Sequence, residues 1–249
     1  MNIIHSYRSV AAGLILFSFL LAGCQTNKYI PANQYLLSKV NIHIDNKSID
    51  KVALKSYQKQ KPNTEIFGFW RFHLGLYNLS SKKKENDWLK RIGEAPVIYD
   101  PFLTIKTREE FKRFMQNKGY YNAVITDSTI LKTNGKAEVS YYITTNLPYM
   151  IKTYQTVIRD DSLRPLLIKK DNASLIKPNS IFDSDLLGSE SQRLLRKLQN
   201  NGYFNSTKNT FYYEADSIGK DRGVDLKLIV EKVSSKELLN ELHNILQYL

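Results

Sequence analysis

The chain has few of the residues from which reactive sites are usually built. Cysteine occurs once and histidine four times in 249 residues, and no histidine has a carboxylate or a second histidine at metal-ligand spacing. Glycine-rich phosphate loops and a Gly-x-Ser-x-Gly motif are also missing. These absences predict a protein without catalytic residues, metal site, cofactor or small-molecule substrate, and therefore not an enzyme.

A long apolar run is missing as well. The N-terminal run from Val10 to Leu21 is too short to span a bilayer as a stable helix, and it follows a weakly basic segment, as in a secretory signal peptide. It ends at Leu-Ala-Gly before Cys24, which resembles a bacterial lipobox. The resemblance implies removal of residues 1–23 and attachment of diacylglycerol and an N-acyl chain such as palmitate to Cys24, followed by a polar tether at 24–34. The alternative is a buried cysteine at the end of a signal helix.

Charge gives weaker information. The 36 Lys and Arg and 24 Asp and Glu residues leave a net charge of +12. Such a balance is compatible with nucleic-acid binding, but a secreted and lipidated chain does not meet nucleic acid. Two interpretations stay open, namely attraction to anionic lipid head groups and a spread of solvated lysines that favours solubility.

Two stretches of the chain have nearly the same sequence. Phe111–Ala123 is FKRFMQNKGYYNA and Leu194–Ser206 is LLRKLQNNGYFNS. In each, an amphipathic helix is predicted to end at a glycine in the left-handed conformation, because a side chain would resist that conformation. The aromatic residue that follows is expected to begin the return to the core. The predicted cap residues are Gly119, Tyr120, Gly202 and Tyr203.

The repeat divides the chain into two units. The first, 35–146, is predicted to contain a strand at 35–45, a helix capped by Ser48, an insertion at about 63–101, and a helix that begins with a capping box at Thr107 and Glu110. A strand at 123–131 follows, and an Asn134-Gly135 turn leads into the next strand.

The second unit, 147–233, is predicted to repeat this plan. A strand at 149–158 precedes a short helix capped by Asp160 or Asp161, and Asp183 opens a longer helix. Two strands follow, at 205–214 and 224–231. The tail, 234–249, is predicted to be an amphipathic helix.

The insertion of the first unit is rich in aromatic residues and is expected to be helical around Trp88–Ile92. Its aromatic side chains are expected to pack under the domain; the alternatives are contact with a partner or with the bilayer interface. These aromatic residues are Phe67, Phe69, Trp70, Phe72 and Tyr77.

The order strand, helix, helix, strand, strand, with the second helix closing at Gly-Tyr, resembles the polypeptide-transport-associated (POTRA) domain of the BamA/TamA outer-membrane assembly superfamily. The lipobox together with NKYIPANQYLLSKV, GFWRFHLGLYNL, RIGEAPVIYDP and NKGYYNA is similar to the lipidated TamA relatives of Bacteroidetes-type bacteria, the TamL family. The resemblance implies an α+β fold of tandem POTRA-like domains, each a mixed three-stranded sheet with two helices on one face. Family members continue into a barrel, and none follows here, so the chain is expected to be a truncated product or a free-standing arm.

The resemblance also implies a function. The chain would be anchored in the outer membrane with its domains in the periplasm, and would bind unfolded outer-membrane proteins or a TamB-like periplasm-spanning protein. An exposed sheet edge can accept such chains through main-chain hydrogen bonds. The alternative is a structural lipoprotein that bridges the membrane and envelope components. The candidate edge residues are Val40, Ile42 and Ile44; Ala123 and Ile125; Ile151 and Thr153; and Phe211 and Tyr213.

Overall fold

The computed structural model describes residues 28–68, 70–84, 87–168, 173–217 and 221–232. The signal peptide, Cys24 and the C-terminal helix that the sequence predicts lie outside the described residues. The chain divides into two compact units. The first comprises the residues up to Phe111 together with Ile125–Thr144, and the second comprises Lys112–Val124 together with the residues from Thr145 onward.

The sheet of the first unit has the order β1-β3-β2. The strands are β1 (Leu36–Ile44), β2 (Val124–Leu131) and β3 (Lys136–Thr144), and β1 runs parallel to β3. The hairpin between β2 and β3 closes as predicted, with the Lys132 N–H donating to the Lys136 carbonyl at 2.8 Å and Gly135 at a φ of 72°. Parallel pairing of the first strand with the last makes the sheet mixed.

The helices of the first unit begin where short capping signals allow, and two of the predicted starts are wrong. Asp50, not Ser48, caps α2 (Lys51–Ser56). The long helix α5 (Pro101–Asn117) begins six residues before the predicted Thr107, because proline suits the first helical turn and the Asp100 carboxylate accepts the Phe102 N–H at 2.8 Å. Thr107 lies inside this helix.

The insertion carries two short helices, α3 (Phe72–Leu79) and α4 (Trp88–Ile92), and the second has the bounds that the sequence predicts. The expected packing of its aromatic residues is wrong for Phe67, which is 83% exposed, and for Trp70, which is 41% exposed. Phe72 and Tyr77 are partly buried, and Phe69 lies outside the described residues. The insertion is anchored by Leu74, which is buried.

One face of the first sheet forms the core of its unit. Alternate residues of β3 are buried and pack toward the helices, and the Phe111 ring of α5 meets the Tyr141 ring of β3 edge to face at 5.2 Å. The buried residues of this core include Leu36, Leu37, Leu54, Leu74, Phe111, Ala137, Val139, Tyr141 and Ile143.

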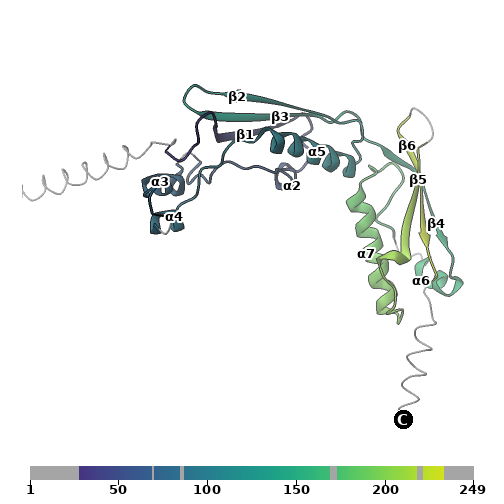
Figure 1. Ribbon diagram of the computed structural model, residues 1–249. Coiled ribbons are helices and arrows are strands. Elements are labelled where there is room, and N and C mark those ends of the chain that lie inside the picture. The colour runs from purple at the N-terminus through teal and green to yellow at the C-terminus, as the bar shows by residue number, and fades with distance from the viewer. Residues whose placement is uncertain (1–27, 69, 85–86, 169–172, 218–220, 233–249) are drawn as a thin grey trace, which may run out of the picture. The chain divides into compact units, whose positions relative to one another are not determined.

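The second unit repeats the arrangement with the order β4-β6-β5. Its strands are β4 (Met150–Ile158), β5 (Phe211–Asp216) and β6 (Gly223–Val230), with β4 parallel and β5 antiparallel to β6. Between the strands lie the 3₁₀ turns η1 (Asp161–Leu163) and η2 (Lys208–Thr210) and the helices α6 (Arg164–Leu167) and α7 (Ser184–Asn200). Figure 1 shows α7 on one face of this sheet. The expected α+β class with mixed three-stranded sheets is confirmed.

The helices of the second unit begin at the predicted caps. The Asp160 carboxylate accepts the Ser162 N–H at 3.1 Å, and the Asp183 carboxylate accepts the Asp185 N–H at 2.8 Å. The apolar stripe of α7 then packs on the sheet, as its 3.6-residue period requires. The cores are formed by Leu194, Leu195 and Leu198 with Ile158, Leu163, Leu167, Phe211, Leu228 and Val230, and by Leu187 with Ile151, Ile176 and Leu226.

Candidate strand-docking edges

The strand order decides which strands can accept another chain. β3 and β6 are central, so β1, β2, β4 and β5 are the outer strands of the two sheets. An outer strand exposes unpaired N–H and C=O groups at every second residue, since successive residues of a strand direct these groups to opposite sides. The residues whose main-chain groups are open therefore differ from one outer strand to the next.

The first half of β1 is already covered. Residues 97–99 pair with it as a short antiparallel segment, in which the Leu37 N–H donates to the Val97 carbonyl and the Tyr99 N–H donates to the Tyr35 carbonyl, both at 2.8 Å. A bulge follows between Leu37 and Lys39, where the Arg71 guanidinium donates to the Ser38 carbonyl. The open edge of β1 is thus confined to its second half.

The second half of β1 directs three residues outward. The Asp45 N–H donates to the Ile143 carbonyl of β3 at 3.3 Å, so alternate residues before Asp45 also face β3. The main-chain groups of Val40, Ile42 and Ile44 then face away from the sheet, and within the described residues they have no main-chain partner. All three are candidate residues from the sequence.

The first half of β4 is also covered by a short segment and followed by a bulge. Its two candidate residues, Ile151 and Thr153, are therefore wrong as open edge positions. The Ile151 N–H donates to the Ser180 carbonyl at 2.8 Å, and the Ile151 carbonyl accepts the Asn179 N–H at 2.7 Å, so both groups are occupied. A bulge follows between Ile151 and Thr153, and Arg159 N–H bonding to Val230 places Thr153 on the β6 side. The open positions are Tyr154 and Thr156.

Of the two candidate residues near β2, one lies before the strand and one lies within it. Ala123 is wrong as an edge residue, because it precedes the strand, its side chain is buried and its N–H donates to the Tyr120 carbonyl at 3.1 Å. Ile125 is the second residue of β2 and is partly buried.

The β5 edge is open next to a helix. The Glu231 N–H donates to the Thr210 carbonyl at 2.9 Å, so even-numbered residues of β5 face β6 while Phe211, Tyr213 and Ala215 face outward. The Phe211 N–H is held by η2. Tyr213 and Ala215 keep both main-chain groups free of any partner within the described residues.

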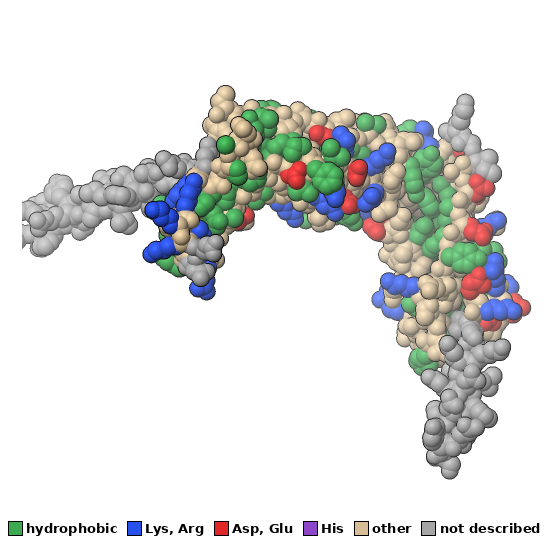
Figure 2. Space-filling view, viewed as in Figure 1, with side chains coloured by type: hydrophobic (Ala, Val, Ile, Leu, Met, Phe, Trp, Pro, Cys, Tyr) green, Lys and Arg blue, Asp and Glu red, His purple; other side chains and the backbone are tan. Residues whose placement is uncertain are grey.

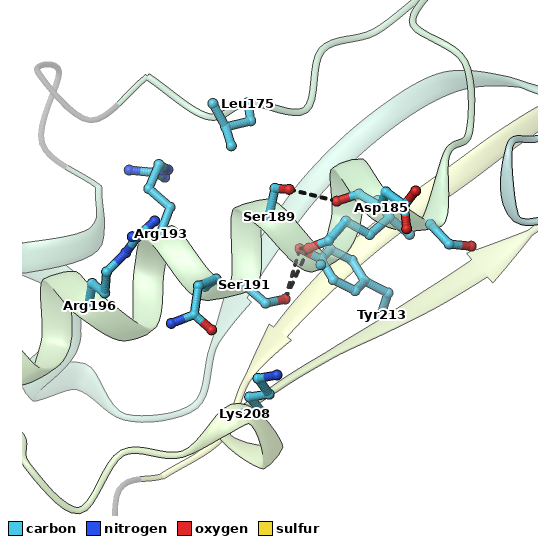
Figure 3. Close-up of a pocket in the computed structure, with 12 residues that line it drawn as sticks. Leu175, Asp185, Ser189, Ser191, Arg193, Arg196, Lys208 and Tyr213 are labelled. Carbon is cyan, nitrogen blue, oxygen red and sulfur yellow. Dashed lines mark hydrogen bonds between the residues drawn. The ribbon is translucent and has the colours of Figure 1, made fainter. Parts of the chain in front are cut away.

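A groove of about 940 Å³ runs between this edge and α7 (Figure 3). Tyr213 spans its floor, with the phenol O–H donating to the Leu187 carbonyl at 3.0 Å and the Ser191 hydroxyl donating to the phenol oxygen at 3.3 Å. Burial raises the pKa of the Tyr213 phenol, which therefore stays a neutral donor. The other residues of the lining are Leu175, Ser184, Asp185, Gly188, Ser189, Gln192, Arg193, Arg196 and Lys208.

The acidic side chains in and beside the groove are paired with basic ones, whereas two basic side chains of the lining have no acidic partner among the residues that the structure describes. Glu190 is buried, and although burial opposes its ionisation, hydrogen bonds from Arg193, the Leu175 N–H and Ser174 together lower its pKa. Asp185 is paired with Lys118 at 2.6 Å. Arg196 and Lys208 have no ion-pair partner within the described part of the chain, so the groove carries excess positive charge at one end.

The repeated Gly-Tyr caps position the chain before β2 and β5. Gly119 and Gly202 have φ values of 85° and 91°. The Tyr120 N–H donates to the Met115 carbonyl at 2.8 Å and the Tyr203 N–H to the Leu198 carbonyl at 3.1 Å, as in a Schellman motif. A Cβ on Gly119 would lie 2.6 Å from the Ile181 Cγ2, whereas one on Gly202 would have nothing within 4 Å. The two caps share a conformation but not an environment.

Sequence reasoning missed the segments that cover β1 and β4; it offered a groove between sheet and helices as a second candidate surface, without the residues that line it. The covering segments, 97–99 and 179–181, are too short to show a strand period. The groove depends on how α7 lies against β5, for which the sequence has no local signal. Within the described residues, no cluster of three His, Cys, Asp or Glu side chains is placed to hold a metal ion, and no helix is both long and apolar enough to cross a membrane.

No family model and no curated protein matches this chain, whereas several solved structures are similar to it. BamA POTRA3-5 from Haemophilus influenzae is 15% identical over 82% of this chain and 69% of that chain, with a TM-score of 0.39. BamA from Haemophilus ducreyi lacking POTRA domains 1-3 is 12% identical over 80% of this chain but 29% of that chain, with a TM-score of 0.39. POTRA1-2 of the periplasmic domain of Omp85 from Anabaena is 11% identical over 81% and 98%, with a TM-score of 0.32. Similarity at these TM-scores does not establish a function for this chain.

Proposed function

We propose that the chain is a lipid-anchored periplasmic module of POTRA type, which binds extended chains at its open strand edges during outer-membrane protein assembly. The observation that carries the proposal is the β5 edge, where the main-chain groups of Tyr213 and Ala215 are open and Tyr213 also lines the α7 groove. The order β-α-α-β-β with a parallel outer strand supports the POTRA type; the second unit has this order, and the first has it with α3 and α4 of the insertion added between its two other helices. The proposal includes that this module is of the lipidated TamA-like type, TamL.

Binding at this edge would use two kinds of contact. An incoming strand would exchange main-chain hydrogen bonds with Tyr213 and Ala215, which makes recognition nearly independent of sequence. Its alternate side chains would lie over the groove, which offers the apolar side chains of Leu175 and Leu187 and the positive charge of Arg196. This combination suits unfolded chains that alternate apolar and polar residues, as strands of outer-membrane proteins do.

The covered halves of β1 and β4 limit where else a chain can add. Because 97–99 and 179–181 occupy the beginning of each strand, an incoming strand meets only Val40, Ile42 and Ile44 on β1 and Tyr154 and Thr156 on β4. These shorter edges would suit a folded partner that adds one strand, such as a TamB-like periplasm-spanning protein. The proposed location is the outer membrane, with both units facing the periplasm.

Photo-cross-linking in cells tests the proposal. A photoreactive residue at Ala215, on the open edge, should capture outer-membrane protein precursors, identified by mass spectrometry. The same residue at Glu109, on the exposed side of α5, serves as the control. Equal capture of precursors at both positions, or none at Ala215, would overturn the proposal and favour the structural lipoprotein that bridges membrane and envelope.

A further inference from the structure

The insertion of the first unit presents a surface that strand docking does not use. The α3–α4 surface consists of the C-terminal end of α3, loop residues 80–84 and 87, and α4, together with Lys28 and Tyr29. Leu79, Trp88 and Ile92 on it are 61%, 64% and 47% exposed, respectively. Trp88 and Ile92 are one helical turn apart and share one side of α4. An exposed tryptophan with exposed aliphatic side chains on the same surface indicates an interaction site.

The start of the described chain is fixed to this surface. The Lys28 ammonium donates to the Asn78 carbonyl at 2.9 Å and to the Ser80 carbonyl at 2.6 Å. The Tyr29 hydroxyl donates to the Ser80 carbonyl at 2.8 Å, and its ring meets the Tyr77 ring edge to face at 4.9 Å. Residues 28 and 29 are therefore tied to the end of α3.

Covalent geometry then limits the distance to Cys24. Lys28 is four residue steps after Cys24, and an extended chain advances at most about 3.6 Å per residue, which sets a maximum of about 14 Å. This step rests on the proposed acylation of Cys24. If the acyl chains enter the bilayer there, the α3–α4 surface cannot be farther than that from the membrane.

The charge of the surface fits an anionic membrane. Lys82, Lys83, Lys84, Lys90 and Arg91 lie between residues 80 and 92. The Nζ atoms of Lys28, Lys82 and Lys90 lie 5.4, 5.8 and 5.7 Å from the Tyr29 ring centroid. Figure 2 shows Lys and Arg side chains gathered over this part of the first unit.

Glu85 and Asp87 offset two of these five positive charges, so residues 80–92 keep a net charge of +3. Asp87 accepts the Ser81 N–H at 2.7 Å and the Leu89 N–H at 3.1 Å, and these hydrogen bonds lower its pKa. It is thus engaged in capping α4. A tryptophan among lysines is the composition of protein segments that lie in the head-group region of membranes.

We propose that the α3–α4 surface docks on an anionic phospholipid bilayer, with Trp88 in the head-group region and the lysines on the lipid phosphates. Acyl chains at Cys24 would attach the chain, and this surface would fix how the first unit lies on the membrane. The lysine contacts make the docking sensitive to salt.

Vesicle co-sedimentation of the processed chain, residues 24–249 with Cys24→Ser, tests the surface without any acyl chain. We expect binding to phosphatidylcholine vesicles that contain phosphatidylglycerol, little binding to phosphatidylcholine alone, and release at about 1 M salt. Replacing Lys82, Lys83 and Lys84 by glutamine should weaken binding by about tenfold or more. The matched control replaces the exposed Lys51, Lys55 and Lys106 by glutamine, which lowers the net charge equally.

The fluorescence of Trp88 gives a second readout. The chain has two tryptophans, so Trp70→Phe leaves Trp88 as the reporter, and its emission should shift to the blue on anionic vesicles. Equal losses in the two lysine triples, or absence of binding to anionic vesicles at low salt, would overturn the proposal. A blue shift that depends on protein concentration without lipid would show a second copy of the chain on this surface instead. Failed acylation at Cys24 would leave this result unaffected, because the variant carries no acyl chain.

Discussion

Replacing Gly119 by alanine should destabilise the protein by roughly 2–4 kcal/mol, since two costs add at this position. The φ of 85° is unfavourable for any residue with a Cβ. The new Cβ would also lie 2.6 Å from the Ile181 Cγ2 and 2.9 Å from the Phe182 carbonyl oxygen, so main chain would have to move. Gly202→Ala meets the first cost alone and should destabilise by about 1 kcal/mol.

Urea unfolding followed by circular dichroism measures both variants. Gly188→Ala is the matched control, because Gly188 lies inside α7 with nothing within 4 Å of a Cβ and alanine favours the helix. We expect this control to unfold at the same or a higher urea concentration. Equal losses for Gly119→Ala and Gly202→Ala would contradict the packing of Gly119 against Ile181.

Replacing Cys24 by alanine should release the protein from membranes that have been washed with about 1 M salt, which screens the contacts of the α3–α4 surface. Each buried CH₂ of an acyl chain contributes about 0.8 kcal/mol, so the loss of two or three acyl chains removes stable anchoring. If processing requires the acylated thiol, the variant should instead accumulate as an uncleaved precursor. Membrane fractionation and the electrophoretic size of the chain give the result.

Thr26→Ala is the control for this experiment, since it changes the tether and keeps the thiol. It should remain in the membrane fraction at the mature size. If Cys24→Ala is retained in washed membranes at the mature size as well, the proposed acylation is wrong.

Much of the fold follows from local patterns. The Asn134-Gly135 turn, the caps at Asp160 and Asp183 and the two Gly-Tyr helix ends all depend on residues within a few positions of each other. Such signals are visible in the sequence because their hydrogen bonds are local. The start of α5 was missed although Asp100 and Pro101 are a cap and a first-turn proline, because Thr107 and Glu110 inside the helix have the spacing of a second capping signal.

The open edges follow from the sequence only in part. Period-two alternation places Val40, Ile42 and Ile44 on one face of β1, but it does not reveal the bulges after Leu37 and Ile151. A bulge adds one residue and reverses which main-chain groups face outward. Thr153 falls after the bulge of β4 and faces β6, so it was a wrong candidate, whereas Val40 falls after the bulge of β1 and faces outward.

The affinity of a synthetic peptide for two variants of Ala215 tests the open β5 edge most directly. The peptide, of about ten residues with alternating apolar and polar side chains, represents a strand of an outer-membrane protein. Ala215→Pro removes the outward N–H while leaving the bonds of its neighbours to β6, and Ala215→Ser keeps that N–H. We predict that proline weakens peptide binding by about tenfold and that serine leaves it unchanged. Equal affinities for two variants of equal stability would contradict strand addition at β5.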